Sequence, residues 1–193
     1  MAQDRVIKYK LIAVGGSAGS LEVILKIVGV LPLNEDVALL IIVHRKNDGE
    51  SILADLISTR TKFVVKEIED KETILSGHVY IAPADYHVLF ENEKMFSLDS
   101  SEKVNHSRPS IDVSFESLAE VFGENAIAIL LSGANADGAH GISKIKQAGG
   151  FTIVQDPESA EVDFMPQQAL EQMKPDKILN SAEIAGFLQQ LFQ

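Results

Sequence analysis

The stretch LIAVGGSAGSLEVI, residues 11–24, carries an apolar run directly into a glycine-rich turn and then into a helical pattern. Residues Lys10–Val14 are predicted to form a strand. Ser20–Leu31 is predicted to be a helix, because its apolar residues at 21, 24, 25, 28 and 31 share one face of a 3.6-residue period. A strand that turns this sharply into a helix usually presents a chemical group, either a phosphate-binding loop or the side chain of Ser17.

The turn does not fit the known phosphate-binding loops. A dinucleotide-binding fingerprint that starts at Gly15 needs glycines at positions 17 and 20, where this chain has serines. A Walker-type loop needs a lysine after its glycine, and the first lysine after the turn is Lys26. Residues 15–19 instead match the pattern G-x-S-x-G, whose small residues allow a tight turn that presents a serine hydroxyl. A packing turn in which Ser17 only caps the helix is the alternative.

Outward from this stretch, apolar runs alternate with amphipathic helical patterns. Further strands are predicted at 38–43, 63–67, 79–82, 126–131 and 151–154, with helices starting at Ser110, Gly141, Pro166 and Ser181. HVLFENEKMFSL, residues 87–98, predicts an antiparallel hairpin. This alternation predicts one domain, residues 1–193, with a three-layer, doubly wound α/β fold: a mostly parallel sheet with an antiparallel edge hairpin.

Composition limits the classes of function. The 193 residues include no cysteine, which excludes disulfides, a thiol nucleophile and thiolate metal sites and favours a cytoplasmic protein. The net charge of -11, without a cluster of lysine and arginine, argues against nucleic acid and anionic membranes as partners. The longest apolar run, Val37–Val43, is too short to insert into a membrane, which takes roughly 20 residues.

A nucleophilic serine needs a base, and the base needs an orienting group. His44 follows the apolar run ALLIIV, and Asp137 follows a second apolar run in the loop SGANADG. Like Ser17, both residues stand at the carboxyl end of a predicted strand, where ligand crevices form in α/β sheets. We therefore predict a Ser17–His44–Asp137 triad, although Asp85 and Asp156 also follow strands. The remaining histidines are interpreted as solvated or locally bonded: His78, His87, His106 and His140.

Six stretches, VGGSAGS, IIVHRKN, GHVYIAPADYHVLF, SRPSIDVSFESLA, ILLSGANADGAHGISKIKQAGGFTIVQD and DFMPQQAL, occur in order from Leu11 to about Leu170. Together they resemble the catalytic domain of the chemotaxis protein-glutamate methylesterases, the CheB family. The resemblance implies hydrolysis of glutamate methyl esters on chemoreceptors and, in some members, deamidation of receptor glutamines. It implies Ser17 as nucleophile, His44 as general acid and base, and Asp137 as orienting carboxylate, with no metal and no organic cofactor.

Two residues depart from the pattern of this family. Ala18 stands where threonine usually follows the nucleophile, and Ala134 stands where methionine is usual in the loop SGANADG. This loop and the serine turn are expected to contribute the oxyanion and substrate contacts, through Gly16, Ala18, Gly133, Ala134 and Asn135.

The expected partners are the methylated cytoplasmic helices of chemoreceptors or a related signalling protein. Nine residues precede Lys10, whereas the family usually carries an N-terminal receiver domain. We expect either a free-standing esterase or one domain of a protein that also holds a receiver or methyltransferase domain. The alternative functions are a glutamine deamidase, an esterase with a different substrate, or a non-catalytic signalling module of the same fold.

Overall fold

A parallel sheet forms the centre of the computed structural model, which describes residues 10–32, 36–45 and 52–192. The described residues form seven strands in the order β3-β4-β2-β1-β7-β8-β9, and all neighbouring pairs run parallel. Their bounds are β1 Lys10–Gly16, β2 Val37–Val43, β3 Val64–Glu67, β4 His78–Ile81, β7 Ile127–Leu130, β8 Phe151–Gln155 and β9 Lys177–Leu179.

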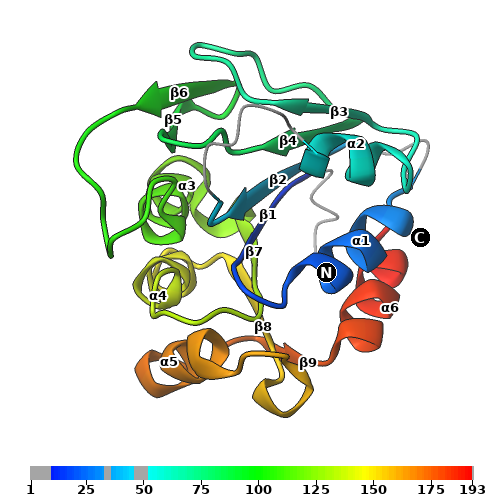
Figure 1. Cartoon of the computed structure of the whole chain (residues 1–193), viewed down its shortest axis with the longest axis vertical. Helices are drawn as coiled ribbons and strands as arrows, with labels where there is room; N and C mark the ends of the chain where they lie inside the picture. The colour runs from blue at the N-terminus through cyan, green and yellow to red at the C-terminus, as the bar shows by residue number, and fades with distance from the viewer. Residues whose placement is uncertain (1–9, 33–35, 46–51, 193) are drawn as a thin grey trace, which may run out of the picture.

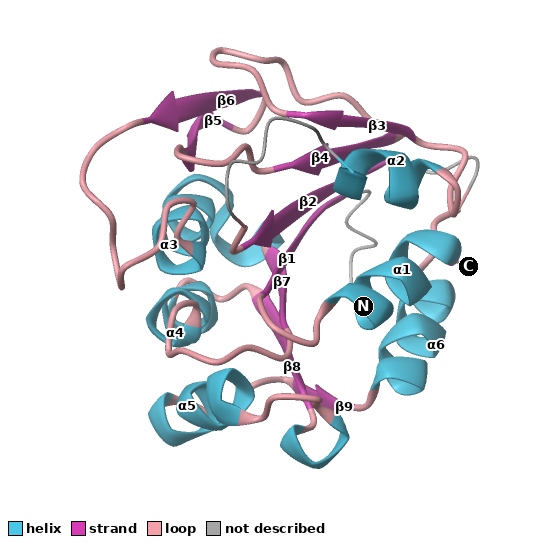
Figure 2. Ribbon diagram, viewed as in Figure 1, coloured by secondary structure: helices cyan, strands magenta, loops and turns pink. Residues whose placement is uncertain are grey.

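Helices cover both faces of this sheet, which makes three layers (Figure 1). Figure 2 shows one group of helices on one face and a second group on the other. The first group is α1 Leu21–Gly29, α2 Ile52–Ser58 and α6 Ser181–Leu191, and the second is α3 Ile111–Phe122, α4 Ala139–Gln147 and α5 Phe164–Gln172. The predicted three-layer, doubly wound α/β class is therefore confirmed. No helix in the described ranges is long and apolar enough to cross a membrane.

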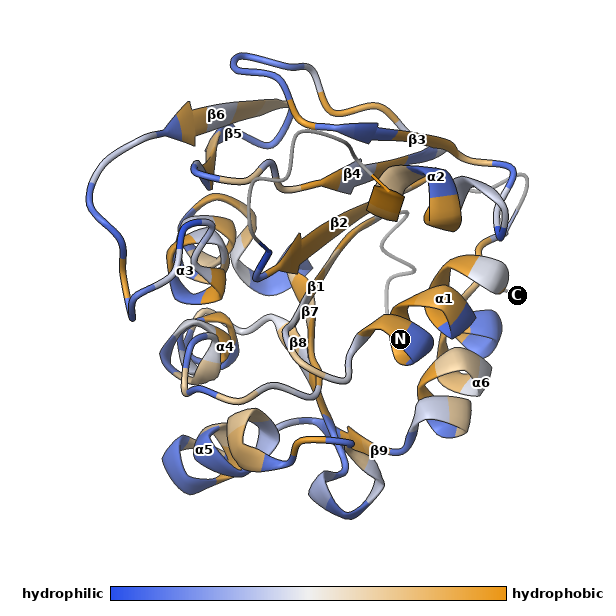
Figure 3. Cartoon of the chain, viewed as in Figure 1, coloured by the Kyte–Doolittle hydropathy of each residue, from blue (hydrophilic) through white to orange (hydrophobic). Residues whose placement is uncertain are grey.

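Strands β1, β2, β4, β7 and β8 are mostly apolar because both of their faces are covered, whereas β3 and β9 at the ends of the sheet are more exposed (Figure 3). In β1, Leu11 and Ala13 belong to the core cluster that includes the buried residues of α3 and α4. Ile12 and Val14 point the other way, into the cluster that includes the buried face of α1. Because both faces of the sheet are packed against apolar residues, polar side chains gather at the carboxyl ends of the strands.

The predicted hairpin is present as β5 His87–Asn92 and β6 Met95–Asp99, an antiparallel pair. It forms a two-stranded sheet of its own and does not extend the main sheet. Phe90 and Phe96 are buried, and the Phe90 ring meets Phe122 of α3 edge to face at a centroid distance of 5.3 Å. The hairpin therefore packs on α3, the helix that begins at the candidate site.

Several predicted boundaries need correction. Asn180, not Ser181, caps α6, because the Asn180 side chain accepts the backbone N–H groups of residues 182 and 183 in a capping box. Helix α5 begins at Phe164, which places Pro166 inside its first turn, and α4 begins at Ala139, before Gly141. Two short elements, α2 and β9, were not predicted.

The order of the strands creates a switch point between β1 and β7. After β1 the chain crosses through α1 on one face, and after β7 it crosses through α4 on the other (Figure 1). Loops that leave neighbouring strands on opposite faces leave a crevice between them at the carboxyl ends. The loops that follow β1, β2 and β7 carry Ser17, His44 and Asp137 respectively.

Candidate active site

Ser17 is the first residue after β1, in a turn fixed by backbone contacts. Its N–H donates to the Ser132 carbonyl at 2.9 Å, and its own carbonyl accepts the N–H and the hydroxyl of Ser20 at 3.1 and 2.7 Å. Gly19 has a φ of +79°, and a Cβ there would lie 2.6 Å from Glu161 Cβ, so glycine is required at this position. The Ser20 side chain therefore holds the turn rather than capping α1, and Ser17 stays partly exposed.

His44 occupies the matching position on the neighbouring strand. The register pairs Gly16 of β1 with Val43 of β2, so Ser17 and His44 are the next residues on two adjacent strands. Neighbouring strands lie about 4.8 Å apart. Within the described residues no hydrogen bond joins the Ser17 hydroxyl to His44, but catalytic hydrogen bonds often close only when substrate is bound.

His44 is held by Asp137. Its Nε2 lies 2.7 Å from Asp137 Oδ2, and the His44 and Asp137 side chains are 14% and 0% exposed. An ionised carboxylate can only accept, so Nε2 carries the proton and Nδ1 of the neutral imidazole is left as the acceptor. The amide nitrogen of Asn135 lies 3.5 Å from that Nδ1. The contact between His44 Nε2 and Asp137 therefore fixes both the tautomer and the orientation of the imidazole ring.

Asp137 is enclosed by donors from the start of α3. Its Oδ1 accepts the Ser110 hydroxyl at 2.7 Å, the Asp112 N–H at 3.1 Å and the Asn105 amide at 3.1 Å, and its Oδ2 accepts the Ile111 N–H at 2.7 Å. Burial raises the pKa of Asp137, but the hydrogen bonds from His44, Ile111 and Ser110 outweigh it and the pKa lies below its ordinary value of 3.8. The carboxylate is therefore ionised at neutral pH.

A second buried carboxylate, Asp112, supports the first. Its Oδ1 accepts the N–H groups of Gly138 and Gly141 at 2.9 and 2.6 Å, and its Oδ2 accepts the Asn105 amide at 2.7 Å. Burial, with a contribution from the nearby charge of Asp137, raises the pKa of Asp112 above its ordinary value. Asp112 thus ties α3 to the chain that directly follows Asp137.

The loop between β7 and α4 offers unpaired donors. The side-chain oxygen of Asn135, Oδ1, accepts the Asp137 N–H at 3.0 Å. Gly133 is fixed by two backbone hydrogen bonds: its N–H donates to the Val162 carbonyl, and its carbonyl accepts the Met165 N–H. Within the described part of the chain, the N–H groups of Ala18, Ala134 and Asn135 have no acceptor. Backbone donors of this kind at the end of a sheet can bind a developing oxyanion. Gly16, which was also expected to contribute to this region, is instead the last residue of β1 and pairs with Val43 of β2.

The other candidates from the sequence lie outside the contact between His44 and Asp137, and the prediction of a solvated or locally bonded histidine is wrong for His87, which is 1% exposed and bonded to residues 15 and 23 positions away. Asp156 caps the turn at 157–159, while Asp85 and His106 line a cavity beside His44. His87 is buried between the Glu102 carbonyl and the Ser110 N–H, and His78 Nδ1 contacts the Ser76 carbonyl. His140 Nε2 lies 3.5 Å from Glu116 Oε1. Among the described contacts, none joins these three histidines directly to His44 or Asp137, although His87 accepts the N–H of Ser110, whose hydroxyl donates to Asp137.

Sequence reasoning missed Asn105, Asp112 and the second role of Ser110. Ser110 was predicted as a helix cap, and its hydroxyl does accept the Val113 N–H at 3.4 Å. The same hydroxyl donates to Asp137, across a separation of 27 residues. The stretch SRPSIDVSFESLA resembles the CheB family, but the spacing of its residues does not indicate that it contacts the loop that carries Asp137.

Comparisons with known proteins agree on one family. The sequence profile described as CheB methylesterase matches residues 12–188. A protein of Leptospira interrogans is 42% identical over 189 residues, which cover 96% of each chain. The protein-glutamate methylesterase/protein-glutamine glutaminase of Escherichia coli K12 is 38% identical over 164 residues, which cover 83% of this chain and 47% of that protein.

The structural comparison agrees with the sequence comparisons. The CheB methylesterase catalytic domain of Thermotoga maritima superposes with a TM-score of 0.88 at 33% identity, and the match covers 95% of this chain and 98% of that one. A shared fold at this identity, together with a profile match over nearly the whole chain, confirms the resemblance found in the motifs. The chain belongs to the CheB methylesterase family.

Proposed function

We propose that this chain hydrolyses the γ-methyl esters of glutamate side chains on a signalling protein and releases methanol. Ser17 acts as the nucleophile, His44 as general base and acid, and Asp137 as the carboxylate that orients His44. The observation that carries the proposal is the 2.7 Å contact of His44 Nε2 with a fully buried carboxylate, directly beside the strand end that holds Ser17. The substrate class comes from the names of the relatives.

In the first half of the reaction, Ser17 Oγ attacks the ester carbonyl carbon while His44 Nδ1 takes the hydroxyl proton. Nε2 keeps its proton and its bond to Asp137, which stabilises the imidazolium. The tetrahedral oxyanion accepts hydrogen bonds from unpaired backbone N–H groups, of which Ala18 and the Ala134–Asn135 segment are the candidates. When the intermediate collapses, the bond to the methoxy oxygen breaks and His44 returns the proton, so that methanol leaves.

In the second half, water attacks the acyl-enzyme carbonyl while His44 again removes a proton. The bond to Ser17 Oγ then breaks, the proton passes to Oγ, and the glutamate side chain is released as a carboxylic acid. In each half of the reaction His44 accepts one proton and later gives it up, so the enzyme returns to its starting state.

Deamidation of glutamine is the second candidate, because the relatives carry both activities in their names. The same triad performs it with ammonia in place of methanol as the leaving group. We propose chemoreceptor cytoplasmic helices, or a related signalling protein, as the substrate in either case, which would place the reaction in the cytoplasm.

The test uses the purified chain and the methylated cytoplasmic part of a chemoreceptor. Methanol is measured by gas chromatography and ammonia by an enzyme-coupled assay on the glutamine form. A fluorophosphonate probe, followed by peptide mass mapping, reports whether Ser17 is an activated nucleophile. Absence of both products would overturn the proposal, and absence of labelling at Ser17 would overturn the proposed nucleophile.

A further inference from the structure

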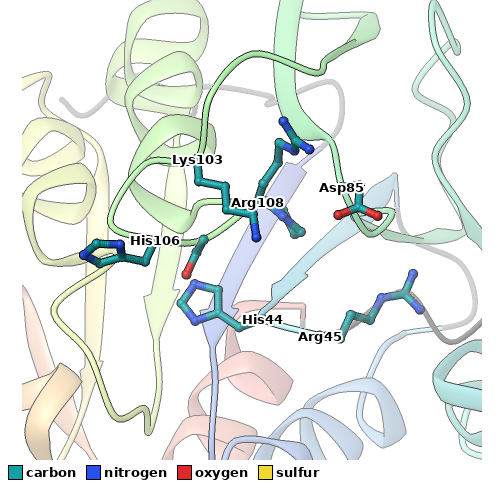
Figure 4. A pocket seen from close by; sticks show the side chains of 8 residues that line it. His44, Arg45, Asp85, Lys103, His106 and Arg108 are labelled. Carbon is teal, nitrogen blue, oxygen red and sulfur yellow. The ribbon is translucent and has the colours of Figure 1, made fainter.

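A cavity of about 460 Å³ borders His44, and the chemistry of the triad does not use most of it. Its described lining residues come from three loops: the end of β2, the loop between β4 and β5, and the loop between β6 and α3 (Figure 4). They are His44, Arg45, Asp85, Lys103, His106, Ser107, Arg108 and Pro109. We call this cavity the basic pocket.

The positive charges of the pocket are unequally compensated. Arg45 forms an ion pair with Glu67. Arg108 Nη1 donates to the carbonyl oxygens of Ser100 and Ser101 at 2.9 and 2.7 Å, which are neutral acceptors. Lys103 is exposed and forms no ion pair with another described residue. Figure 4 shows its side chain extending from the loop toward His44.

This local charge is opposite to that of the molecule. The chain carries a net charge of -11, so an acidic partner would be repelled by most of its surface. The described lining residues include three cations, Arg45, Lys103 and Arg108, and one carboxylate, Asp85; because Arg45 is paired with Glu67, the excess of positive charge rests on Lys103 and Arg108. A cluster of one sign within a concave site attracts the opposite charge to that place.

The loop between β6 and α3 both lines the basic pocket and surrounds the carboxylate of Asp137. Lys103 and Arg108 stand on the segment that leads into α3, and Asn105 and Ser110 of that segment donate to Asp137. The loop is therefore held in one arrangement relative to His44. A group bound by Lys103 and Arg108 would have a fixed position relative to the reacting ester.

We propose that the basic pocket binds a carboxylate side chain of the protein substrate, next to the ester that is hydrolysed. The inference rests on the proposed function, because the reacting group itself is a neutral ester that offers no charge to recognise. On a helical substrate, residues three or four positions from the ester lie about 5–6 Å away on the same face. The preferred substrate is thus an acidic helical segment that carries a methylated glutamate.

The test measures binding without turnover. Two fluorescein-labelled helical peptides carry the same central glutamate methyl ester, one with glutamates and one with glutamines at the positions three and four residues away. Each is titrated by fluorescence anisotropy with Ser17→Ala, with Ser17→Ala/Lys103→Glu, and with Ser17→Ala/Lys174→Glu. Lys174 is exposed in the loop after α5, so its reversal matches the change in net charge outside the pocket.

We expect the acidic peptide to bind the Ser17→Ala chain about tenfold more tightly than the glutamine peptide. This preference should vanish in Lys103→Glu, persist in Lys174→Glu, and shrink as salt is added, since salt screens exposed charges. Equal binding of the two peptides, or equal losses in the two lysine variants, would overturn the inference. Because no step depends on hydrolysis, failure of the proposed function would show separately, as an absence of methanol release by the unmodified chain.

Discussion

At the scale of single residues, Asp137 shows how this chain keeps a charge inside its core. A fully buried carboxylate without partners would be protonated at neutral pH, because burial disfavours the charged form. In the part of the chain that the structure describes, five donors surround Asp137, three of them from residues 110–112 at the start of α3. The helix N-terminus adds a favourable dipole, so the charge costs little and remains available to orient His44.

Ser17→Ala should abolish methanol release while leaving the fold unchanged. The hydroxyl forms no hydrogen bond with another described residue, so the free energy of unfolding should change by less than about 0.5 kcal/mol. Turnover should fall by roughly 10⁴-fold or more if Ser17 is the nucleophile. Ser58→Ala, an exposed serine in α2, serves as control and should retain full activity. Near-normal turnover by Ser17→Ala would remove Ser17 from the mechanism.

Asp112→Ala should impair both stability and turnover, although Asp112 does not touch His44. Its loss leaves the buried N–H groups of Gly138 and Gly141 without their acceptor, at a cost of about 2–5 kcal/mol in unfolding free energy. Because these groups hold the chain after Asp137, kcat should fall more than KM rises. Asp112→Asn keeps one acceptor oxygen and should restore part of both losses. Urea unfolding and steady-state kinetics measure these effects, and an unchanged kcat in a folded Asp112→Ala chain would limit Asp112 to stability.

At the scale of elements, the β7–α4 connection brings together the parts of the site. It carries the Ala134 and Asn135 donors, then Asp137, and then Gly138 at the start of α4. Gly138 has a φ of +96°, and a Cβ there would lie 2.5 Å from Leu130 Cδ1 and 2.8 Å from Ile111 Cγ2. Only glycine therefore allows α4 to start this close to α3.

Gly138→Ala is expected to destabilise the chain by about 1–3 kcal/mol, because alanine is strained at this φ and has no space. The turn should shift Asp137 relative to His44, so turnover should fall further than stability alone predicts. Gly186→Ala in α6 is the matched control, since a Cβ there meets nothing within 4 Å. It should be neutral or stabilising by up to about 1 kcal/mol. Thermal unfolding of both variants checks the contrast, and equal effects would contradict it.

The elements that the sequence predicted well are those whose signal is local. Period-3.6 patterns and apolar runs indicated α1, α3 and the long strands, and the strand ends indicated that Ser17, His44 and Asp137 follow neighbouring strands at one edge of the sheet. The short β9, residues Lys177–Leu179, is mostly exposed and lacks an apolar run. Asp112 and Asn105 were missed because their roles depend on contacts with Asp137 and Gly138, 25 to 32 residues away. Periodicity carries no information on contacts of that range.

At the scale of the whole molecule, two neighbouring buried carboxylates make stability depend on pH in opposite directions. The pKa of Asp137 is lowered, so its contribution to stability is present above 3.8, the ordinary value, and is lost as the pH falls through the folded pKa. The pKa of Asp112 is raised, so its contribution is present below 3.8 and is lost as the pH rises through the folded pKa.

The two asparagine variants should therefore separate with pH. The destabilisation caused by Asp137→Asn should grow as the pH rises toward 3.8 from the acid side and then level off, because the unmodified chain gains the stability of the ionised, hydrogen-bonded Asp137. The destabilisation caused by Asp112→Asn should shrink as the pH rises above 3.8, because the variant is relieved of ionising a buried group. Each slope is limited to about 1.4 kcal/mol per pH unit, the value for one proton. Urea unfolding of the three chains across this range measures both slopes, and slopes of the same sign would contradict the opposite directions in which the two pKa values are shifted.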